Sequence, residues 1–449
     1  MKKNLFTCVS MLLLYGGINA QTSSKQWTLE ECISYAIENN IILKQQKQVE
    51  ESKALELNVS QNSRMPSLNA NLGQNLYFGR TPSRDGVIVD QNSANSSFQV
   101  QLNVPLFEGF KIQNTIAVRK LNLMAATESL NKAQEDLALN VASYFLQALY
   151  NKEILSIAEL QVNLTKEQVT RTELLVEVGK VPMSQLYDIK AQLARDEVTL
   201  VEAKNNVSLA LLDLAQTLEL ERLGADFDIV QPDNNDLINN DMSNVLLPDN
   251  IYDNAISYKP QIKEQEYLLE SQKKMLKVAQ SDYYPRLSFI ANYSNGYYHY
   301  FGNNAFESLP LSEQIKQNEQ KIIGLNLNIP IFNRLDIRNN VRISRVAITS
   351  QELMMENSKK ALYKDIQQAY FMAIGAQEKY IASEKSVLAS KEALTYAEER
   401  YSAGKSTVFE YNESKAKYAQ SLSEQAQAKY NFIFRKKILD FYNGIPITM

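Results

Sequence analysis

A heptad pattern near the C-terminal end of the chain constrains its fold more than any other feature. Between positions 366 and 401, small, hydroxylated or apolar residues recur at alternating spacings of three and four. These residues are Ile366, Ala369, Ala373, Ala376, Tyr380, Ser383, Val387, Ser390, Leu394, Ala397 and Tyr401. The spacing is typical of long helices packed side by side as in a coiled coil, and not of helices around one globular core. The pattern stops at Ala403-Gly404-Lys405, so we predict two long helices over 366–441, joined there by a tight turn.

The same pattern occurs once more in the first half of the chain. One seam is Val141, Tyr144, Ala148, Asn151, Leu155, Ala158, Val162, Thr165, Val169, Thr172 and Val176. After a turn at Val178-Gly179-Lys180, the returning seam is Leu186, Ile189, Leu193, Asp196, Leu200, Ala203, Val207, Ala210 and Leu214. At ~1.5 Å per residue, a helix over 112–177 would be on the order of 100 Å long.

Each helical hairpin is preceded by two stretches in which apolar and polar residues alternate. In the first half these stretches are 68–76 and 98–104, and in the second half they are 287–293 and 323–329. Alternation with a period of two predicts strands with one apolar and one polar face. We therefore expect β-hairpins at about 67–105 and 286–330.

These elements predict a mainly α fold built from a duplicated unit of helix, β-hairpin, long helix, turn and return helix. The first repeat is expected to cover 21–235, with its helical hairpin at about 112–220. The second is expected to cover 236–449, with its helical hairpin at about 337–442. Thr28 and Glu31 form a capping-box pattern, so the first helix should start there and extend to about Asn62.

The first 20 residues have the pattern of a secretory signal peptide. Lys2 and Lys3 precede an apolar stretch over 5–18, and Ala20 stands before the expected cleavage site. The next residue is Gln21, so no lipidation is expected there. Cys32 is then the one cysteine left in the mature chain, and we expect it to be buried as a small apolar residue. No later stretch has the ~18 consecutive apolar residues of a transmembrane helix.

Charge and composition argue against nucleic-acid binding and against catalysis. Without Lys2 and Lys3, 45 basic residues stand against 51 acidic ones, a charge of about −6. His299 is the one histidine, so neither a catalytic triad nor a histidine-based metal site is expected. Lys405 and Ser406 follow Gly404 as in a phosphate-binding loop, but Glu399 stands where that loop needs glycine. We expect no enzyme activity, no cofactor and no metal.

Four strands in one chain cannot close a barrel, and open strand edges are not viable in lipid. Three chains would supply twelve strands, an even number within the range of outer-membrane barrels. Threefold symmetry would also gather the long helices into a cylinder. The apolar strand faces would then point to lipid and the Asn-, Gln- and Ser-rich faces to water.

The motifs together resemble the TolC-type outer-membrane efflux protein family over essentially the whole mature chain. The resemblance is carried by the start Trp27-Thr28-Leu29-Glu30-Glu31, prolines Pro105 and Pro330 after paired strands, the duplicated Gly-Lys turns, and the end Phe441-Tyr442-Asn443-Gly444. It implies a homotrimer in the outer membrane, with a twelve-stranded β-barrel continued by an α-helical barrel through the periplasm. Such a channel is a passive exit duct for efflux or type I secretion, docked to a periplasmic adaptor and an inner-membrane pump.

Two carboxylates beside the second turn are candidates for a pore constriction. Glu410 and Glu413 are three residues apart, on one face of the return helix. In a trimer they would form two rings of three carboxylates, able to select cations. The alternative is two solvated helix glutamates.

The resemblance implies further gate residues. Acidic residues at the positions of Glu410 and Glu413 line the constriction in this family, Tyr401 matches its gate tyrosine, and Ser184 and Gln185 match its polar partners. The family pattern has a carboxylate where this chain has Gln185 and an arginine where it has Ser406. A charge-paired latch is therefore not expected in that form, although Lys405 could substitute for the arginine.

The two glycine turns are the candidate docking tips for the adaptor. They comprise Val178, Gly179, Lys180, Ala403, Gly404 and Lys405. The simpler reading is helix C-capping, and both can hold. A rival for the whole chain is a periplasmic coiled-coil adaptor or structural scaffold, which would explain the seams but not two β-hairpins with apolar faces.

Overall fold

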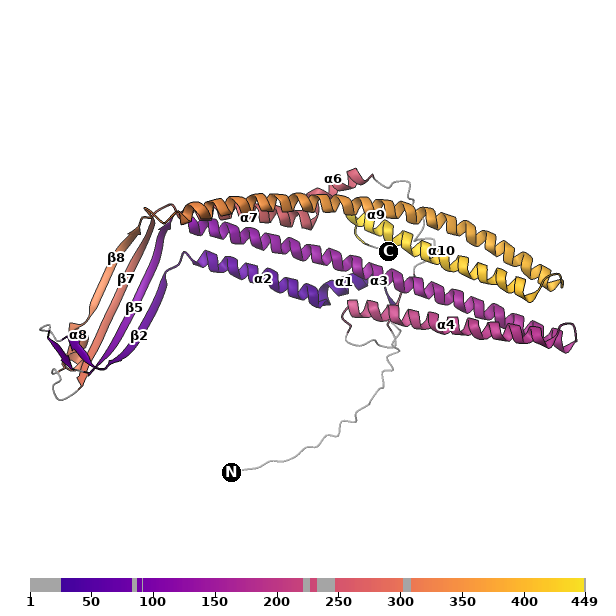
Figure 1. The fold of residues 1–449 in the computed structure, drawn as a ribbon, viewed down its shortest axis with the longest axis horizontal. Helices are drawn as coiled ribbons and strands as arrows, with labels where there is room; N and C mark the ends of the chain where they lie inside the picture. The colour runs from indigo at the N-terminus through magenta and orange to yellow at the C-terminus, as the bar shows by residue number, and fades with distance from the viewer. Residues whose placement is uncertain are drawn as a thin grey trace, which may run out of the picture.

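The computed structural model describes residues 26–82, 87–90, 92–220, 227–231, 247–301 and 308–447. The expected signal peptide, and the boundary expected between the repeats at 235 and 236, lie outside these residues. The chain is elongated, with long, gently curved helices at one end and a four-stranded sheet at the other (Figure 1).

The helices occur as two series of identical lengths. The first series is α1 Leu29–Asn39, α2 Ile41–Asn62, α3 Lys111–Glu177 and α4 Met183–Thr217. The second is α6 Pro248–Tyr258, α7 Pro260–Ser281, α9 Asp336–Ser402 and α10 Val408–Tyr442. Both run 11, 22, 67 and 35 residues, which confirms the predicted duplicated unit. A short helix that was not expected, α8 Leu311–Gln317, follows the strand of the second hairpin.

The prediction of one continuous helix from Thr28 to Asn62 is wrong. The predicted capping box is present, but the backbone of Asn40 leaves the helical conformation at ψ 129°. Its side-chain oxygen accepts hydrogen bonds from the backbone N–H groups of Ile42 and Leu43, at 2.9 and 3.3 Å. Asn40 therefore starts a second helix, because it satisfies N–H groups that would otherwise lack a partner. In the second repeat Pro260 opens the corresponding helix, where its missing N–H costs nothing.

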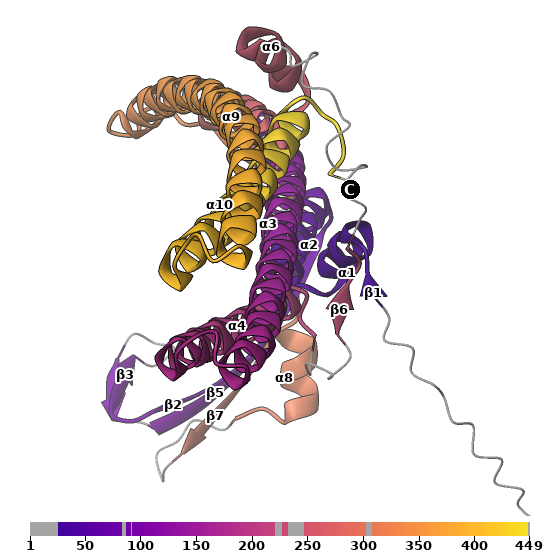
Figure 2. The ribbon, with the colours of Figure 1, turned by 90° about the vertical axis from the view of Figure 1, so that its right-hand side faces the viewer.

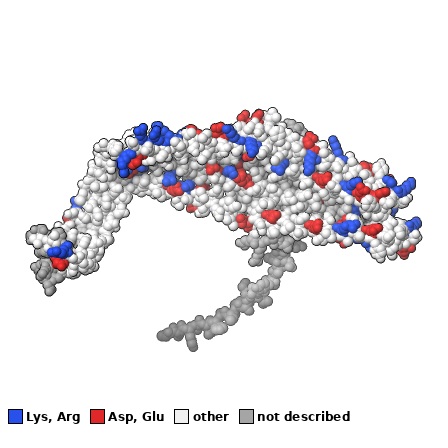
Figure 3. Space-filling view, viewed as in Figure 1, with Lys and Arg blue, Asp and Glu red and all other residues white. Residues whose placement is uncertain are grey.

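The two predicted β-hairpins join into one antiparallel sheet with the strand order β2-β5-β7-β8. Its strands are β2 Ser67–Tyr77, β5 Asn92–Glu108, β7 Arg286–Phe301 and β8 Gln320–Asn328. Phe98 lies opposite Leu72 on one side and Asn295 on the other, so the central pair β5 and β7 unites the repeats. Strands β2 and β8 are left as the two outer edges. In the four strands, acidic and basic residues occur only close to strand ends, at Glu108, Arg286 and Lys321, and the sheet is almost free of charge in Figure 3.

Two small ladders complete the strands. Strand β3 Arg80–Pro82 pairs with β4 Ile88–Asp90 inside the loop of the first hairpin. Strand β1 Gln26–Trp27 pairs in parallel with β6 Asp228–Ile229, which ties the start of the first repeat to the residues after α4. None of the helices in the described ranges has the length and hydropathy needed to cross a membrane.

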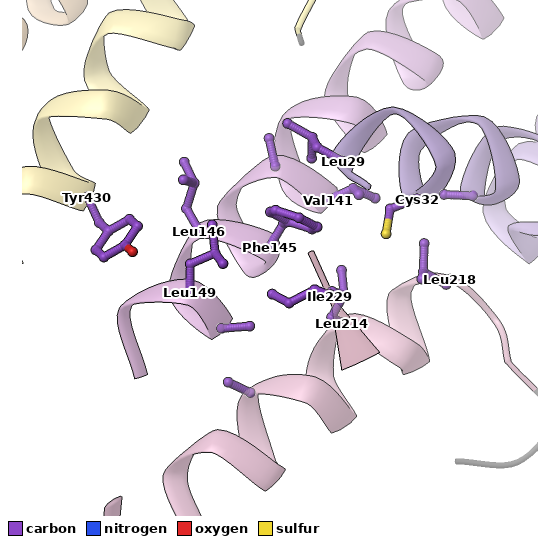
Figure 4. Packing of buried hydrophobic residues seen from close by; sticks show 14 of the residues in the cluster. Leu29, Cys32, Val141, Phe145, Leu146, Leu149, Leu214, Leu218, Ile229 and Tyr430 are labelled. Atoms are coloured by element: carbon purple, nitrogen blue, oxygen red, sulfur yellow. The ribbon is translucent and has the colours of Figure 1, made fainter. Parts of the chain in front are cut away.

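The main core lies where α1, α3, α4, α10 and β6 meet (Figure 4). Phe145 and the predicted buried Cys32 are 1% and 0% exposed there, and burial of a side chain such as Phe145 contributes about 1.5–3 kcal/mol. The smaller core of the second repeat includes Ala255 and Ile366, both fully buried. Most seam predictions hold, but Tyr144 is 41% exposed and its neighbour Phe145 takes the buried position. A straight helix has 3.6 residues per turn and a heptad pattern assumes 3.5, so positions spaced as a strict heptad gradually rotate away from the buried face.

Candidate functional site

The two predicted turns have the same backbone structure at the free ends of the helical hairpins. At the first turn Lys180 N–H donates to Leu175 O and Gly179 N–H to Val176 O, at 2.8 and 2.9 Å. At the second, Lys405 and Gly404 make the equivalent bonds to Arg400 and Tyr401, at 2.9 and 3.0 Å. This is the Schellman pattern, which satisfies the last carbonyl groups of a helix.

Glycine is required at these turns by backbone conformation and not by crowding. Gly179 and Gly404 have φ values of +72° and +70°, and a Cβ at either would meet no atom of this chain within 4 Å. The C-caps Val178 and Ala403 have ordinary φ values of −85° and −81°. The helix-capping interpretation therefore holds for both turns, and their surfaces are exposed. Docking of an adaptor stays a prediction.

The structure brings two of the five predicted gate residues together. Gln185, near the start of α4, donates from Nε2 to the hydroxyl oxygen of Tyr401 near the end of α9, at 3.0 Å. The Tyr401 ring stacks on Tyr411 of α10, with centroids 5.4 Å apart and planes at 19°. Tyr411 is 7% exposed, and this burial raises the pKa of its hydroxyl group. A neutral hydrogen bond thus joins the two helical hairpins at the place where the resemblance implies charged groups.

The other residues around this contact are not joined to it. Among the described residues, the exposed side chain of Ser184 makes no hydrogen bond and the exposed Lys405 makes no ion pair. The hydroxyl oxygen of Ser406 is buried without a partner there. Lys405 therefore does not replace the missing arginine within one chain.

Glu410 and Glu413 are both exposed and both have local partners. Thr407 N–H donates to Glu410 Oε2 at 3.4 Å, and Glu410 N–H donates to Thr407 Oγ1 at 3.2 Å, which forms a capping box. Glu413 pairs with Lys417 at 2.7 Å, one turn further along α10. Glu410 therefore stabilises the start of α10, whatever its role in a pore. A constriction formed by these two residues stays a prediction.

A buried polar cluster further along the helices was missed at the level of the sequence. Lys415 of α10 is 1% exposed, and its Nζ lies 3.3 Å from Asp196 Oδ2 of α4. Both groups also contact the hydroxyl of Thr165 of α3, and Gln192 Nε2 donates to Asp196 Oδ1 at 2.7 Å. Burial lowers the pKa of Lys415, and the Asp196 carboxylate opposes that shift. The one signal was an aspartate in an otherwise apolar seam.

Two further lysines are buried among the described residues, and each of them also pairs with a carboxylate of the other repeat. Lys259 pairs with Glu135 at 3.1 Å and lies 3.3 Å above the Phe441 ring, while Lys429 pairs with Glu153. All three buried lysines are in the second repeat, and all three carboxylates are in the first. The three buried ion pairs between the repeats therefore all have the same direction. The reverse pair, Lys111 with Asp282, is only partly buried.

Comparison with known proteins identifies the family. Residues 32–218 and 251–435 match the family described as outer membrane efflux protein. Outer membrane protein TolC of Escherichia coli (strain K12) is 20% identical over 354 residues, which cover 77% of this chain and 68% of TolC. The crystal structure of CusC superposes with a TM-score of 0.77 at 16% identity, over 93% of this chain and 92% of CusC. The outer membrane channel CmeC of Campylobacter jejuni superposes at 0.72 with 18% identity, over 93% and 85% of the two chains.

The structural matches establish a shared fold, and the family match covers one long segment in each repeat. The resemblance seen in the sequence is thereby confirmed. This chain belongs to the outer membrane efflux protein family.

Proposed function

We propose that three copies of this outer membrane efflux protein form one channel, with a twelve-stranded barrel in the membrane and a helical tube below it. The observation that carries this proposal is the sheet with order β2-β5-β7-β8, whose two outer edges have no pairing partner among the described residues. Buried backbone groups need hydrogen-bond partners, and lipid supplies none. Pairing of β8 with β2 of the next copy satisfies both edges, and three copies close the ring.

Exposed apolar residues on the helices support the same assembly. Val59 of α2 and Val346 of α9 are 71% and 70% exposed. In one chain, α2 packs on α3 and α9 packs on α7, so α2 and α9 are the lateral helices. Apolar faces of this kind are typical of surfaces that meet another protein. Contact of α9 with α2 of the next copy would continue the ring of helices.

The free ends of the helical hairpins would form the periplasmic end of this tube. The gate would then be the Gln185–Tyr401 contact with the stacked Tyr411, and Glu410 and Glu413 would line the bore beside it. A tube of this kind holds no energy source. A periplasmic adaptor bound at the glycine turns and an inner-membrane pump would therefore drive transport.

The assembly is tested on detergent-extracted protein by light scattering and in planar lipid bilayers. We expect three chains per particle and discrete single-channel currents. A monomer released into the periplasmic fraction and inactive in bilayers would contradict the channel and favour the adaptor or scaffold reading.

The constriction is tested with Glu410→Gln/Glu413→Gln. Glutamine keeps the capping interaction with Thr407 but removes both charges. We expect lower cation selectivity in a normally assembled channel. The matched control Glu392→Gln/Glu399→Gln removes two exposed charges from α9 and should leave selectivity unchanged. Equal selectivity in all three proteins would refute the constriction.

Adaptor docking is tested with Val178→Glu/Ala403→Glu, which leaves the glycines and their turns intact. We expect loss of efflux in cells while conductance in bilayers is retained. Asn357→Glu, at an exposed position of α9 far from the turns, serves as the control and should leave efflux normal. Normal efflux with the double variant would argue against docking at the tips.

A further inference from the structure

The first three turns of α9 carry three arginines on one side of the helix. Arg338, Arg342 and Arg345 are spaced by four and three residues, which places them on one face. All three are exposed, and within the described part of the chain none of them makes an ion pair. Figure 3 shows basic side chains gathered over this end of α9. We call these three residues the basic face.

The repeat itself supplies an internal comparison. Helices α3 and α9 are both 67 residues long, so their positions can be matched one by one. The positions of Arg338, Arg342 and Arg345 are occupied in α3 by Gln113, Ala117 and Lys120. The duplicated fold therefore does not require the arginines, and a role outside the packing of the helices has to account for them.

Other basic residues near the start of α3 are already paired. Lys111 pairs with Asp282 at 2.9 Å and Arg119 with Glu56 at 2.8 Å. Across residues 334–345, by contrast, Asp336 is the one acidic residue beside four arginines. The whole chain has a net charge of −4. The start of α9 is thus a local positive site on a negatively charged protein, and its natural ligand is an anion.

The basic face lies directly where the sheet, which carries few charges, ends. Strand β8 ends at Asn328 and α9 begins at Asp336. Between them Ile331 and Phe332 are 94% and 78% exposed. From Arg338 to Arg345 the helix rises on the order of 10 Å. A layer of this thickness next to an apolar sheet corresponds to the headgroup region of a bilayer.

The basic face points away from the concave side of the helical layer. Arg338 and Glu356 are 18 residues apart, which is five full helical turns, so they share one face of α9. Glu356, Lys360 and Tyr363 line the groove under α6. Helix α6 lies on the convex side of the curved layer (Figure 2). The arginines therefore face outward, where lipid headgroups would lie, and not into the space enclosed by the helices.

We propose that the basic face binds the phosphate groups of anionic phospholipids in the leaflet next to the helices. The guanidinium group donates two parallel hydrogen bonds to a phosphate, which a surface of three arginines can repeat. Ile331 and Phe332 insert into the acyl region beside them, as apolar anchors do next to basic residues. This inference rests on the proposed function, because it requires the sheet to lie in the membrane.

The test compares lipids retained by the full-length assembly in detergent. The protein is equilibrated with equal amounts of phosphatidylglycerol and phosphatidylcholine, washed, and its bound lipids are quantified by mass spectrometry. We expect a severalfold excess of phosphatidylglycerol on the wild type. In Arg338→Gln/Arg342→Gln/Arg345→Gln the ratio should fall to near one, while the matching triple lysine variant should keep most of the excess. High salt should reduce the excess, since the attraction is electrostatic.

The matched control removes three charges from the same helix further from the sheet. Lys359→Gln/Lys360→Gln/Lys364→Gln lies roughly 30 Å further along α9 and should retain the wild-type ratio. An unchanged ratio in the arginine variant overturns the inference. Dissociation of the arginine variant into single chains, with the control intact, overturns it too, because the basic face would then be a contact between copies. A wild type that neither assembles nor conducts contradicts the proposed function, whereas an intact conducting assembly without lipid preference contradicts this inference alone.

Discussion

Lys415 and Asp196 are 219 residues apart in the chain, yet their charged groups lie 3.3 Å from each other in the interior of the helical region. Lys415 belongs to the second repeat and Asp196 to the first. Their contact, reinforced by Thr165, joins α10 to α3 and α4. It lies one turn beyond Tyr411, which stacks on the tyrosine of the candidate gate. The helical hairpins are thus held together at two successive levels.

Removal of Lys415 alone should be strongly destabilising. Lys415→Met leaves the Asp196 carboxylate buried without its partner, which costs about 3–5 kcal/mol. The double variant Lys415→Met/Asp196→Asn should lose much less than the sum of the two single variants. Denaturant unfolding at one fixed protein concentration measures this. Lys417→Met, which breaks an exposed pair with Glu413, should cost under about 0.5 kcal/mol. Additive losses in the double variant would show that the two groups do not interact.

Tyr401→Phe should favour the open channel. It removes the oxygen that accepts the hydrogen bond from Gln185 Nε2 but keeps the ring on Tyr411. Loss of about 1 kcal/mol from the closed state corresponds to a roughly fivefold shift toward the open one. Single-channel recording gives the open fraction. Tyr396→Phe changes a tyrosine of α9 that is 65% exposed and should leave it unaltered. If both variants behave as the wild type, Tyr401 does not hold the gate.

Gly404→Ala should loosen the tip of the second helical hairpin. A residue with a Cβ pays about 1–2 kcal/mol for the left-handed conformation at this position. Hydrogen–deuterium exchange of the peptides covering the turn should accelerate by about tenfold. Gly404→Asn should stay close to the wild type, because asparagine adopts this conformation more readily. Equal exchange in the alanine variant would mean that the turn has rearranged.

Alkaline pH should destabilise the helical region through Tyr258. Burial, with help from the Glu135 carboxylate, raises the pKa of Tyr258 from 10.0 to about 12. Between these values the folded state keeps a proton that the unfolded state has lost, so the free energy of unfolding falls as the pH rises. Below pH 10 this contribution is fully present, and above about pH 12 it is lost.

Tyr258→Phe separates this effect from the structural role of the hydroxyl. The variant loses the hydrogen bond to Tyr442 O, at 2.7 Å, and should be less stable at pH 8 by about 1 kcal/mol. Its stability should then fall less steeply than that of the wild type between pH 10 and 12. Parallel curves for the two proteins in urea would assign the alkaline loss to other groups.

The sequence was sufficient for features that depend on local periodicity. The alternation around Leu72 and Phe98 predicted strands, and the heptads around Ala373 and Ile189 predicted buried seams, because each residue's neighbours along the chain determine its face. The glycine turns could also be predicted from the sequence, because the left-handed backbone conformation at a helix end is a local requirement that glycine meets. The two repeats also supported each other, as Ala36 and Ala255 both proved to be fully buried.

Some of the features that the sequence analysis did not reveal depend on contacts between distant segments. Lys415 looks like any solvated helix residue until α10 is known to pack on α3 and α4. The break at Asn40 was hidden because apolar residues continue on both sides of it. The capping role of Glu410 was overlooked although it is local, because Thr407 and Glu410 have the same spacing that predicted the cap at Thr28 and Glu31. Of the gate residues, only Gln185 and Tyr401 meet within one chain.

The direction of the three buried lysine pairs has a consequence for how the halves of the protein recognise each other. In these three buried pairs, the first half supplies the carboxylates and the second half the ammonium groups. Two copies of the second repeat brought together in the same way would place Ser421 where Asp196 now faces Lys415, and a buried lysine without its partner costs several kcal/mol. Two copies of the first repeat would place Asn40 where Lys259 now faces Glu135. The pairs therefore favour contact between two unlike halves over contact between two identical ones. A chain cut into its two repeats should consequently reassemble as a mixed pair, and neither half should replace the other.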